Sequence, residues 1–461
     1  MGPTEQLARF VAGFGETAIA EDVRAAALRS IIDGVGAALA GSRQPAGILI
    51  AAQAVGQAGV PESTLWGRSD RVSAQSAALA NGTACHALDF DDVSRSMPGH
   101  PTTVVLPAVW AEAERRALSG RKLVDAYIIG VEVACKLGRL IGPTSYDAGW
   151  HNTSTVGVVG ATAGVSFLAG LDLDATRNAI GIAVSRASGA RVNFGSMTKP
   201  LHAGLAAQAA IQAVELAGRG FTASEASIEG PAGFLALFGD GSDRELLPLG
   251  EPFDLVMPGF DLKLYPCCAA THAAIDSARE CGRDINPVDI EQVDVEVPYN
   301  TPLLLIHHRP TEPLEAKFSL EYTTASALLD GTVDLNSFEQ ESVVRPEVQQ
   351  LLRKVSYRTP PEWEADSGTW TLSSARLTLR LRDGSRRFAE TIYPTGTAER
   401  PLMQSDLERK FLDCAATAVG AAGAARALVG LKALEACDDI REIVGFFAHK
   451  ARSNDDEQRI A

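Results

Sequence analysis

The chain has 461 residues, of which 46% are hydrophobic and 21% are charged, and its formal net charge at pH 7 is -15. This length exceeds what one hydrophobic core normally supports, so we expect a folded globular protein with two domains. The acidic balance excludes nucleic acid and an anionic membrane surface as expected partners, because binding to either requires a basic face.

The first 260 residues are expected to be almost wholly helical. Between residues 21 and 40, apolar side chains recur every three or four positions, and Gly41 follows as a stop. Stretch 156–171 is the most membrane-like one, but it is short and rich in small residues, so we interpret it as a tightly packed internal helix. Similar patterns predict helices over residues 74–86, 107–118, 122–141, 154–169, 175–188 and 200–217.

From residue 265 onward, strand patterns are mixed with helical ones. Residues 290–297 alternate apolar and acidic side chains, as a half-buried strand does. Residues 375–382 and 386–393 predict two further strands, joined by a strong hairpin signal at Asp383-Gly384. Helices are expected between these strands and before them, at residues 271–281, 314–329 and 345–355.

The pattern returns to helix near residue 405, where Ser405 and Glu408 have the spacing of a capping box. The predicted fold class is therefore mainly α. A large all-helical catalytic domain is expected from residues 1–263 and 399–461, with a smaller α+β lid domain, residues 264–398, inserted before the C-terminal helices. Such an arrangement favours a site between two layers.

Cysteine usage and the N-terminus indicate the compartment. The seven cysteines include no CxxC pair of the kind that binds zinc or iron–sulfur clusters, and the first residues have neither a basic nor an apolar signal-peptide region. We expect a reduced, cytoplasmic protein. Cys267 and Cys268 are interpreted as small apolar fillers, with a thiol acid as the alternative.

Lys199 is the first candidate site residue. Pro200 suits the first position of a helix, and His202 follows three residues after the lysine. A cation is unfavourable at a helix N-terminus unless an anion shares the place, and we expect a substrate carboxylate to be that anion. The alternative is a solvated surface lysine.

His151 precedes several good N-cap residues at the start of the Gly-rich helix, where an imidazole can serve as general base or acid. The alternative is a buried structural histidine. Residues 89–92, Asp-Phe-Asp-Asp, crowd three carboxylates that either bind a cation, orient His86 or His100, or form a solvated turn. We favour orientation of an imidazole, because no further run of metal ligands follows.

Other candidates lie in loops and helix starts. His100 stands in a Gly-His-Pro loop, and His272 lies one turn into a predicted helix. Arg309, after two histidines, can clamp a carboxylate, with a polar loop edge as the alternative. The sequence contains no nucleotide-binding loop and no Gly-x-Ser-x-Gly in a strand-turn-helix setting.

These motifs, in this order, resemble the MmgE/PrpD family, which includes 2-methylcitrate dehydratase, cis-aconitate decarboxylase and iminodisuccinate epimerase. The resemblance covers nearly the whole chain to about residue 400. It implies a helical catalytic domain, an α+β lid, a homodimer, and no metal or organic cofactor. The blocks that carry it are residues 84–92, 99–101, 150–155, 198–202, 265–272 and 316–322. It implies a pocket lined by Asp89, His100, His151, Lys199, His272 and Tyr322.

Two departures from the family bear on the reaction. Decarboxylase-like members carry Thr where this chain has Val93, and the loop to His100 is one residue longer here. A missing hydroxyl leaves fewer hydrogen bonds to one substrate carboxylate, which argues against cis-aconitate decarboxylation. The loop 94–99 and the block 150–155 are closer to the epimerase-like branch.

We predict a cofactor-independent lyase that removes a proton next to a carboxylate of a di- or tricarboxylic acid, with loss of water. Lys199 and His100, helped by His202 and Arg309, are expected to bind the substrate carboxylates and to stabilise the developing charge. One alternative is an epimerase that moves a proton between two faces of a dicarboxylate. The second alternative is a non-catalytic, carboxylate-binding helical protein.

The sequence predicts which residues transfer protons, but it leaves some of their roles open. His151 is expected to be the base, with Asp89 orienting a neighbouring imidazole. Tyr322 or His272 is expected to deliver the second proton. Which of His151 and His272 acts as acid and which as base is left open by the sequence.

Overall fold

The structure, a computed structural model, describes residues 1–16, 19–242, 244–363 and 374–448. The chain divides into two compact units, which we call the helical unit (Met1–Phe260 with the chain from Met403) and the α+β unit (Asp261–Leu402). The predicted fold class, mainly α, is confirmed. Residues 264–398, the interval predicted for the smaller domain, lie inside the α+β unit.

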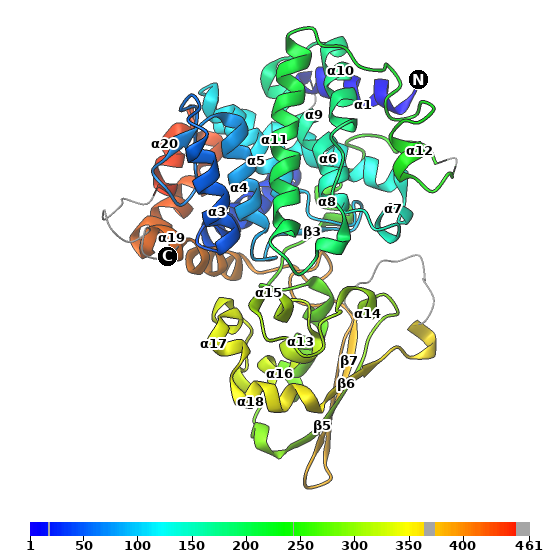
Figure 1. Ribbon diagram of the computed structural model, residues 1–461, viewed down its shortest axis with the longest axis vertical. Coiled ribbons are helices and arrows are strands. Elements are labelled where there is room, and N and C mark those ends of the chain that lie inside the picture. Colours follow the sequence, from blue (N-terminus) through cyan, green and yellow to red (C-terminus); the bar gives the residue numbers. More distant parts are fainter. Residues whose placement is uncertain (17–18, 243, 364–373, 449–461) are drawn as a thin grey trace. The chain divides into compact units, whose positions relative to one another are not determined.

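The helical unit is built from helices of very different lengths, with short strands only in its connections (Figure 1). Strands β1 (Ser63–Thr64) and β2 (Arg71–Val72) form an antiparallel pair. Strand β3 (Val93–Ser94) lies in the loop after α4, and β4 (Phe260–Asp261) lies where the chain leaves this unit. The helices are α1 (Pro3–Gly13), α2 (Glu21–Gly41), α3 (Pro45–Gly56), α4 (Ala74–His86), α5 (Thr102–Arg115), α6 (Gly120–Ile141), α7 (Thr144–Asp147), α8 (Asn152–Thr155), α9 (Gly157–Ala169), α10 (Leu173–Val184), α11 (Thr198–Gly218), α12 (Phe234–Phe238), α19 (Gln404–Lys432) and α20 (Arg441–Val444).

Small residues let the central helices approach closely. Helix α11 packs along α4, and a Cβ added at Gly204 of α11 would lie only 2.2 Å from the carbonyl oxygen of Leu79. In the same way, a Cβ at Gly160 of α9 would lie 2.5 Å from the carbonyl oxygen of Gly130 on α6. Side chains larger than hydrogen are excluded there because real interiors are close-packed. This proximity brings the first turn of α11 next to the end of α4.

Several predicted boundaries move. The helix predicted over 107–118 begins at Thr102 and contains Pro107 inside it. The one predicted over 154–169 is divided into α8 and α9, and the one predicted over 175–188 ends at Val184. Capping and breaker signals are local, whereas these ends depend on burial by neighbouring helices.

The capping box predicted at Ser405 and Glu408 is wrong. Helix α19 begins at Gln404, and the preceding Met403 has the extended backbone of an N-cap residue without a side-chain cap. Ser405 is therefore inside the first turn. The helix register follows the burial of Leu407 and Phe411 on one face, which outweighs the capping preference.

By length and composition alone, α19 could cross a membrane, but core helices of globular proteins pass the same test. One face of α19 packs on α2, and Gly420 interrupts the helix with a φ of +72°. Stretch 156–171, the most membrane-like one in the sequence, forms α9 and its cap, and nearly all of α9 is buried against α5, α6 and α11. That interpretation as an internal helix is confirmed.

The α+β unit contains a four-stranded sheet in the order β6-β5-β7-β8. Strands β5 (Ile290–Glu296) and β6 (Val355–Arg358) are parallel, while β7 (Ala375–Leu381) pairs antiparallel with both β5 and β8 (Arg386–Thr391). The predicted hairpin is confirmed, with Gly384 at a φ of +84°. The helices are α13 (His272–Cys281), α14 (Thr301–Leu304), α15 (Pro313–Ala316), α16 (Leu320–Asp330), α17 (Gln340–Val343) and α18 (Pro346–Leu351).

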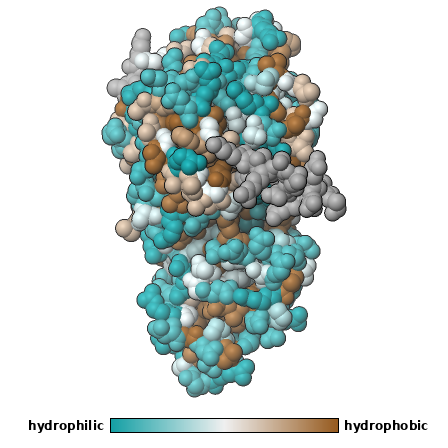
Figure 2. Space-filling view, turned by 90° about the vertical axis from the view of Figure 1, so that its left-hand side faces the viewer, coloured by the Kyte–Doolittle hydropathy of each residue, from teal (hydrophilic) through white to brown (hydrophobic). Residues whose placement is uncertain are grey.

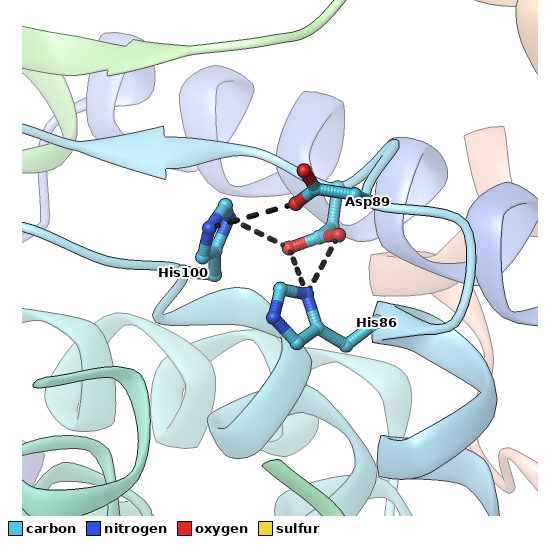
Figure 3. Close-up of side chains that lie close together, drawn as sticks. His86, Asp89 and His100 are labelled. Carbon is cyan, nitrogen blue, oxygen red and sulfur yellow. Dashed lines mark hydrogen bonds and ion pairs between the residues drawn. The ribbon is translucent and has the colours of Figure 1, made fainter. Parts of the chain in front are cut away.

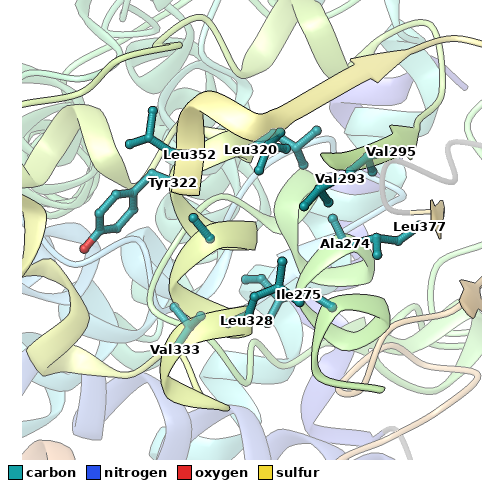
Figure 4. Close-up of a cluster of buried hydrophobic side chains, with 14 of the residues drawn as sticks. Ala274, Ile275, Val293, Val295, Leu320, Tyr322, Leu328, Val333, Leu352 and Leu377 are labelled. Carbon is teal, nitrogen blue, oxygen red and sulfur yellow. The ribbon is translucent and has the colours of Figure 1, made fainter. Parts of the chain in front are cut away.

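The core of this unit lies between the sheet and two helices. Helix α13 packs on β7 and β8, and α16 packs on α13 and β6. Figure 4 shows the buried cluster, to which Val293 and Val295 contribute from β5 and Leu377 from β7. Strand β6 was not predicted, because its four residues follow directly on a helical stretch and are too few to show a period. The face seen in Figure 2 is mostly hydrophilic with scattered apolar residues, as expected of an acidic globular chain.

Candidate active site

A cluster of titratable side chains lies where α4 ends and where α8 and α11 begin. It unites the predicted site residues of the helical unit, and the structure adds His86 and Asp91 to them. As whole residues, Asp89, Asp91 and Asp92 are 4%, 0% and 1% exposed, so the alternative of a solvated turn is wrong. The predicted residues brought together are Asp89, His100, His151, Lys199 and His202.

Asp91 holds two imidazoles at once. Its carboxylate oxygens lie 3.0 Å from Nδ1 of His86, and one of them lies 2.8 Å from Nδ1 of His100. Figure 3 shows His86 and His100 converging on the carboxylates that follow α4. Because a carboxylate accepts, both Nδ1 atoms donate, and each ring presents Nε2 on its other side. An aspartate therefore orients His86 and His100 as predicted, but the orienting residue is Asp91 rather than Asp89.

Burial and neighbouring side chains together determine the charges of His86 and Asp91. Burial dominates at His86. It lowers the pKa of His86 to about 4, outweighing the favourable charge of Asp91. Burial alone would raise the pKa of Asp91, but the imidazoles of His86 and His100 hold it well below its ordinary value. Near pH 7, the inner part of the site is thus a neutral His86 beside an ionised Asp91.

Lys199 is the second residue of α11, and Pro200 is the third. Its Nζ lies 2.9 Å from Oδ1 of Asp89 and 4.9 Å from the ring centre of Phe194. In this structure the anion that pairs with the lysine is therefore Asp89, in the place where a substrate carboxylate was predicted. Both side chains are only 6% exposed, so the alternative of a solvated lysine is wrong. The same Asp89 oxygen lies 3.8 Å from Nε2 of His100.

His151 is itself the N-cap residue of α8, so the good N-cap residues that follow it lie inside the helix rather than at its cap. Its Nδ1 lies 3.1 Å from Nδ1 of His202, so one of the two rings donates and the other accepts. Among the described residues, Nε2 of His151 has no hydrogen-bond partner, although it is buried. Burial, and then the neighbouring imidazoles and Lys199, lowers the pKa of His151 well below its ordinary value. Burial and Lys199 also lower the pKa of His202.

The tautomer of this pair determines what His151 can do. If His151 donates through Nδ1, its Nε2 carries a lone pair and can accept a proton. If His202 donates instead, Nε2 of His151 carries the proton. The same residue can thus be base or acid, in agreement with the choice left open by the sequence.

Four groups of the cluster meet the first requirement of a metal site. His86, Asp89, Asp91 and His100 each offer a ligand atom, and these atoms lie within 4.8 Å of one another. However, Asp91 already accepts N–H from both imidazoles, and Asp89 already pairs with an ammonium. N–H donors and the ammonium of Lys199 thus already occupy the two carboxylates, and the absence of a metal stays our prediction.

The other predicted site residues belong to the α+β unit. His272 begins α13, and its Nε2 lies 3.3 Å from the carbonyl oxygen of Cys267. Tyr322 of α16 donates its hydroxyl hydrogen to the Ser337 carbonyl, and burial raises its pKa to about 12. Arg309 is exposed and donates to the His308 carbonyl oxygen at 3.0 Å, as a polar loop edge does. The catalytic roles of His272 and Tyr322 stay predictions.

Some functional features had no local signal in the sequence. Asp91 was recognised only as one of three neighbouring acids, and the pairing of Asp89 with Lys199 spans 110 residues. Burial raises the pKa of Cys267 to about 12, so this thiol stays protonated, in line with its interpretation as a filler.

The neutral state of His86 predicts how stability depends on pH. In the unfolded chain, a histidine binds a proton below a pH of about 6.5, whereas folded His86 does so only near 4. The contribution of His86 to the free energy of unfolding is therefore fully present above about pH 6.5. As the pH falls below that value toward 4, this contribution declines by about 1.4 kcal/mol per pH unit. Urea unfolding at pH 7, 6 and 5 should show a smaller decline for His86→Gln. Equal declines in both proteins would contradict this assignment.

Sequence comparisons relate this chain to known proteins. A sequence model of the MmgE/PrpD N-terminal domain matches residues 5–247, and one of the MmgE/PrpD C-terminal domain matches residues 265–436. A cis-aconitate decarboxylase from Mus musculus is 30% identical over 88% of this chain and 86% of its own length. The cis-aconitate decarboxylase from Homo sapiens is 32% identical over 76% of this chain and 74% of its own length. That from Aspergillus terreus is 26% identical over 89% and 88%.

Proposed function

Because the chain belongs to the MmgE/PrpD family, as its resemblance predicted, we propose that it is a lyase that moves a proton on a carbon next to a carboxylate. The substrate is a di- or tricarboxylic acid, and the first candidate reaction is the loss of water, as in 2-methylcitrate dehydratase. The observation that carries this proposal is the neutral His151, whose buried Nε2 has no hydrogen-bond partner among the described residues.

The residues of the helical unit supply the first step. Nε2 of His151 accepts the proton from carbon, and the electron pair of the broken C–H bond moves into the adjacent carboxylate as an enediolate. Lys199 stabilises the negative charge that develops there, and His100 is the proposed second residue beside the substrate carboxylate. Since Asp89 already pairs with Lys199 at 2.9 Å, the substrate carboxylate shares this ammonium with Asp89.

In the second step a hydroxide leaves the neighbouring carbon and a C=C bond forms. The hydroxide takes up one proton and departs as water, so atoms and charge balance. Tyr322 and His272 are the proposed donors of that proton. Tyr322 keeps its proton at neutral pH because burial raises its pKa to about 12.

Decarboxylation is the second candidate, and it is favoured by the relatives, which are cis-aconitate decarboxylases. In that reaction carbon dioxide leaves and carbon gains a proton, so the site must supply an acid rather than a base. The side chain of Val93 is buried in β3 and offers no hydroxyl for a second carboxylate, which supports dehydration.

One incubation series in deuterated water separates the reactions. The purified chain is incubated with 2-methylcitrate, citrate, cis-aconitate and a panel of chiral dicarboxylates. Absorbance at about 240 nm, released carbon dioxide and mass spectra are then followed. New unsaturation without carbon dioxide supports dehydration, and carbon dioxide supports decarboxylation. Deuterium uptake without either product supports epimerisation, and no turnover of any acid supports a binding protein.

Removal of metal is expected to leave activity unchanged. Because Lys199 and the imidazole N–H groups already occupy the carboxylates of Asp89 and Asp91, prolonged dialysis against EDTA should not alter kcat/KM. The measurement compares dialysed protein with and without added Mg²⁺, Mn²⁺ or Zn²⁺. An activity lost on dialysis and restored by one ion would show that the four-residue cluster is a metal site.

A further inference from the structure

Lys410 of α19 reaches the turn that carries the candidate catalytic carboxylates. Its Nζ lies 2.7 Å from Oδ1 of Asp33 on α2 and donates to the carbonyl oxygen of Phe90 at 2.7 Å. The ammonium also lies 3.9 Å from the centre of the Phe90 ring. The side chains of Lys410 and Asp33 are 4% and 1% exposed, so this contact is shielded from water and from salt.

The peptide that Lys410 holds lies in the middle of the site. Phe90 separates Asp89, which pairs with Lys199, from Asp91, which binds His86 and His100. Asp89 has a φ of +53°, a left-handed conformation that is uncommon for residues other than glycine and that surrounding contacts help to hold. The hydrogen bond to the Phe90 carbonyl is one such contact, directly after the strained residue.

The other end of the turn is held by uncharged contacts. Burial, helped by the charges of Asp33 and Asp91, raises the pKa of Asp92 well above its ordinary value. Its carboxyl accepts a hydrogen bond from Thr102, whose hydroxyl lies 2.6 Å from that of Tyr127. Lys410 is thus the cation that joins the turn to α2 and α19.

We propose that Lys410 and Asp33 form a positioning pair. By holding the Phe90 carbonyl, the pair sets the direction of Asp89 toward Lys199 and of Asp91 toward His86 and His100. It acts through these groups, since the contacts recorded for Lys410 are with Asp33 and Phe90. This inference rests on the proposed function for its kinetic consequence, but its structural consequence can be measured separately.

The test removes both charges together. Lys410→Met with Asp33→Leu leaves no unpaired buried charge, so the fold should survive. We expect kcat to fall roughly thirtyfold, within the range seen when groups that orient reactive residues are lost, while KM changes less than about threefold. Lys410→Arg keeps the charge and the donors, and should retain most of the activity.

The matched control uses another ion pair of α2, which joins it to the residues that follow α19. Arg24 on α2 pairs with Glu435 at 2.6 Å, as Asp33 pairs with Lys410, but no contact recorded for Arg24 involves residues 89–92. Arg24→Met should therefore lower the melting temperature and leave kcat and the pH profile unchanged. An equal fall in kcat for this control would overturn the positioning role.

A readout without turnover separates this inference from the proposed function. The imidazole NMR signals of His86 and His100 report on their bonds to Asp91. In the Lys410→Met, Asp33→Leu variant, both signals should shift, whether or not the substrate is known. If the double variant does not fold, Lys410→Met is compared with Lys410→Arg by the same signals. Unchanged signals in a folded variant lacking Lys410 would overturn the proposal.

Discussion

Replacing Lys199 with methionine is expected to lower kcat/KM about a thousandfold, the usual effect of removing one group that stabilises a developing negative charge. Lys199 is the ammonium that Asp89 directs into the cluster, at 2.9 Å. Without it, the enediolate and the ionised Asp89 would lie close together without a shared cation. Steady-state kinetics with the substrate identified in the incubation series provides the measurement.

Stability and catalysis must be separated in this variant. Loss of Lys199 leaves Asp89 buried without its closest cation, so the melting temperature should also fall. The double variant Lys199→Met, Asp89→Asn removes that charge and should regain stability without regaining activity. Should Lys199→Met turn over an authenticated substrate at the normal rate, Lys199 has no place in the mechanism.

Replacing His151 with glutamine is expected to lower kcat by about a hundred- to ten-thousandfold, the range for loss of a general base. The base must be neutral to act, and burial lowers the pKa of His151 well below its ordinary value. The normal protein should therefore keep its activity as the pH falls from 7 to 6, and lose it only when the pH falls through the lowered pKa. The pH profile of kcat/KM measures this loss of activity at low pH, which we call the acid limb.

His202→Gln is the control for His151. It removes the ring that His151 contacts at 3.1 Å but keeps the proposed base, so the effect on kcat should be smaller and the acid limb should shift. His151→Gln itself should lack that limb. A variant of His151 that keeps both the rate and the acid limb would assign the base to another residue.

Much of the fold followed from local patterns. The helices over 21–40, 74–86 and 122–141 were predicted to within two residues at each end, because their apolar periods are long and their stops are clear. The hairpin at Gly384 was predicted because that turn requires a positive φ. Strand β6 and the start of α19 were missed, since both depend on tertiary burial.

The individual residues of the candidate site could be predicted from the sequence, but the contacts between them could not. Lys199, His151 and His100 stand beside helix starts, which leave a visible signal in the sequence. Their partners depend on which helices pack together. Asp89 lies 110 residues from Lys199, and Phe90 lies 320 residues from Lys410. No single-sequence pattern reports such pairings, which is why Asp89 was assigned to an imidazole.

The chain returns to the helical unit only after the α+β unit, so the ribosome adds the residues around the candidate site at widely separated times. A ribosome that has just completed Phe90 adds another 320 residues before Lys410 exists, which takes roughly a quarter of a minute to a minute. Once residue 202 has been added, the nascent chain contains every aspartate and histidine of the cluster, but it still lacks the ammonium that holds their turn. Activity is therefore expected to appear only at the end of translation, and a fragment that stops after the α+β unit should bind its ligand poorly.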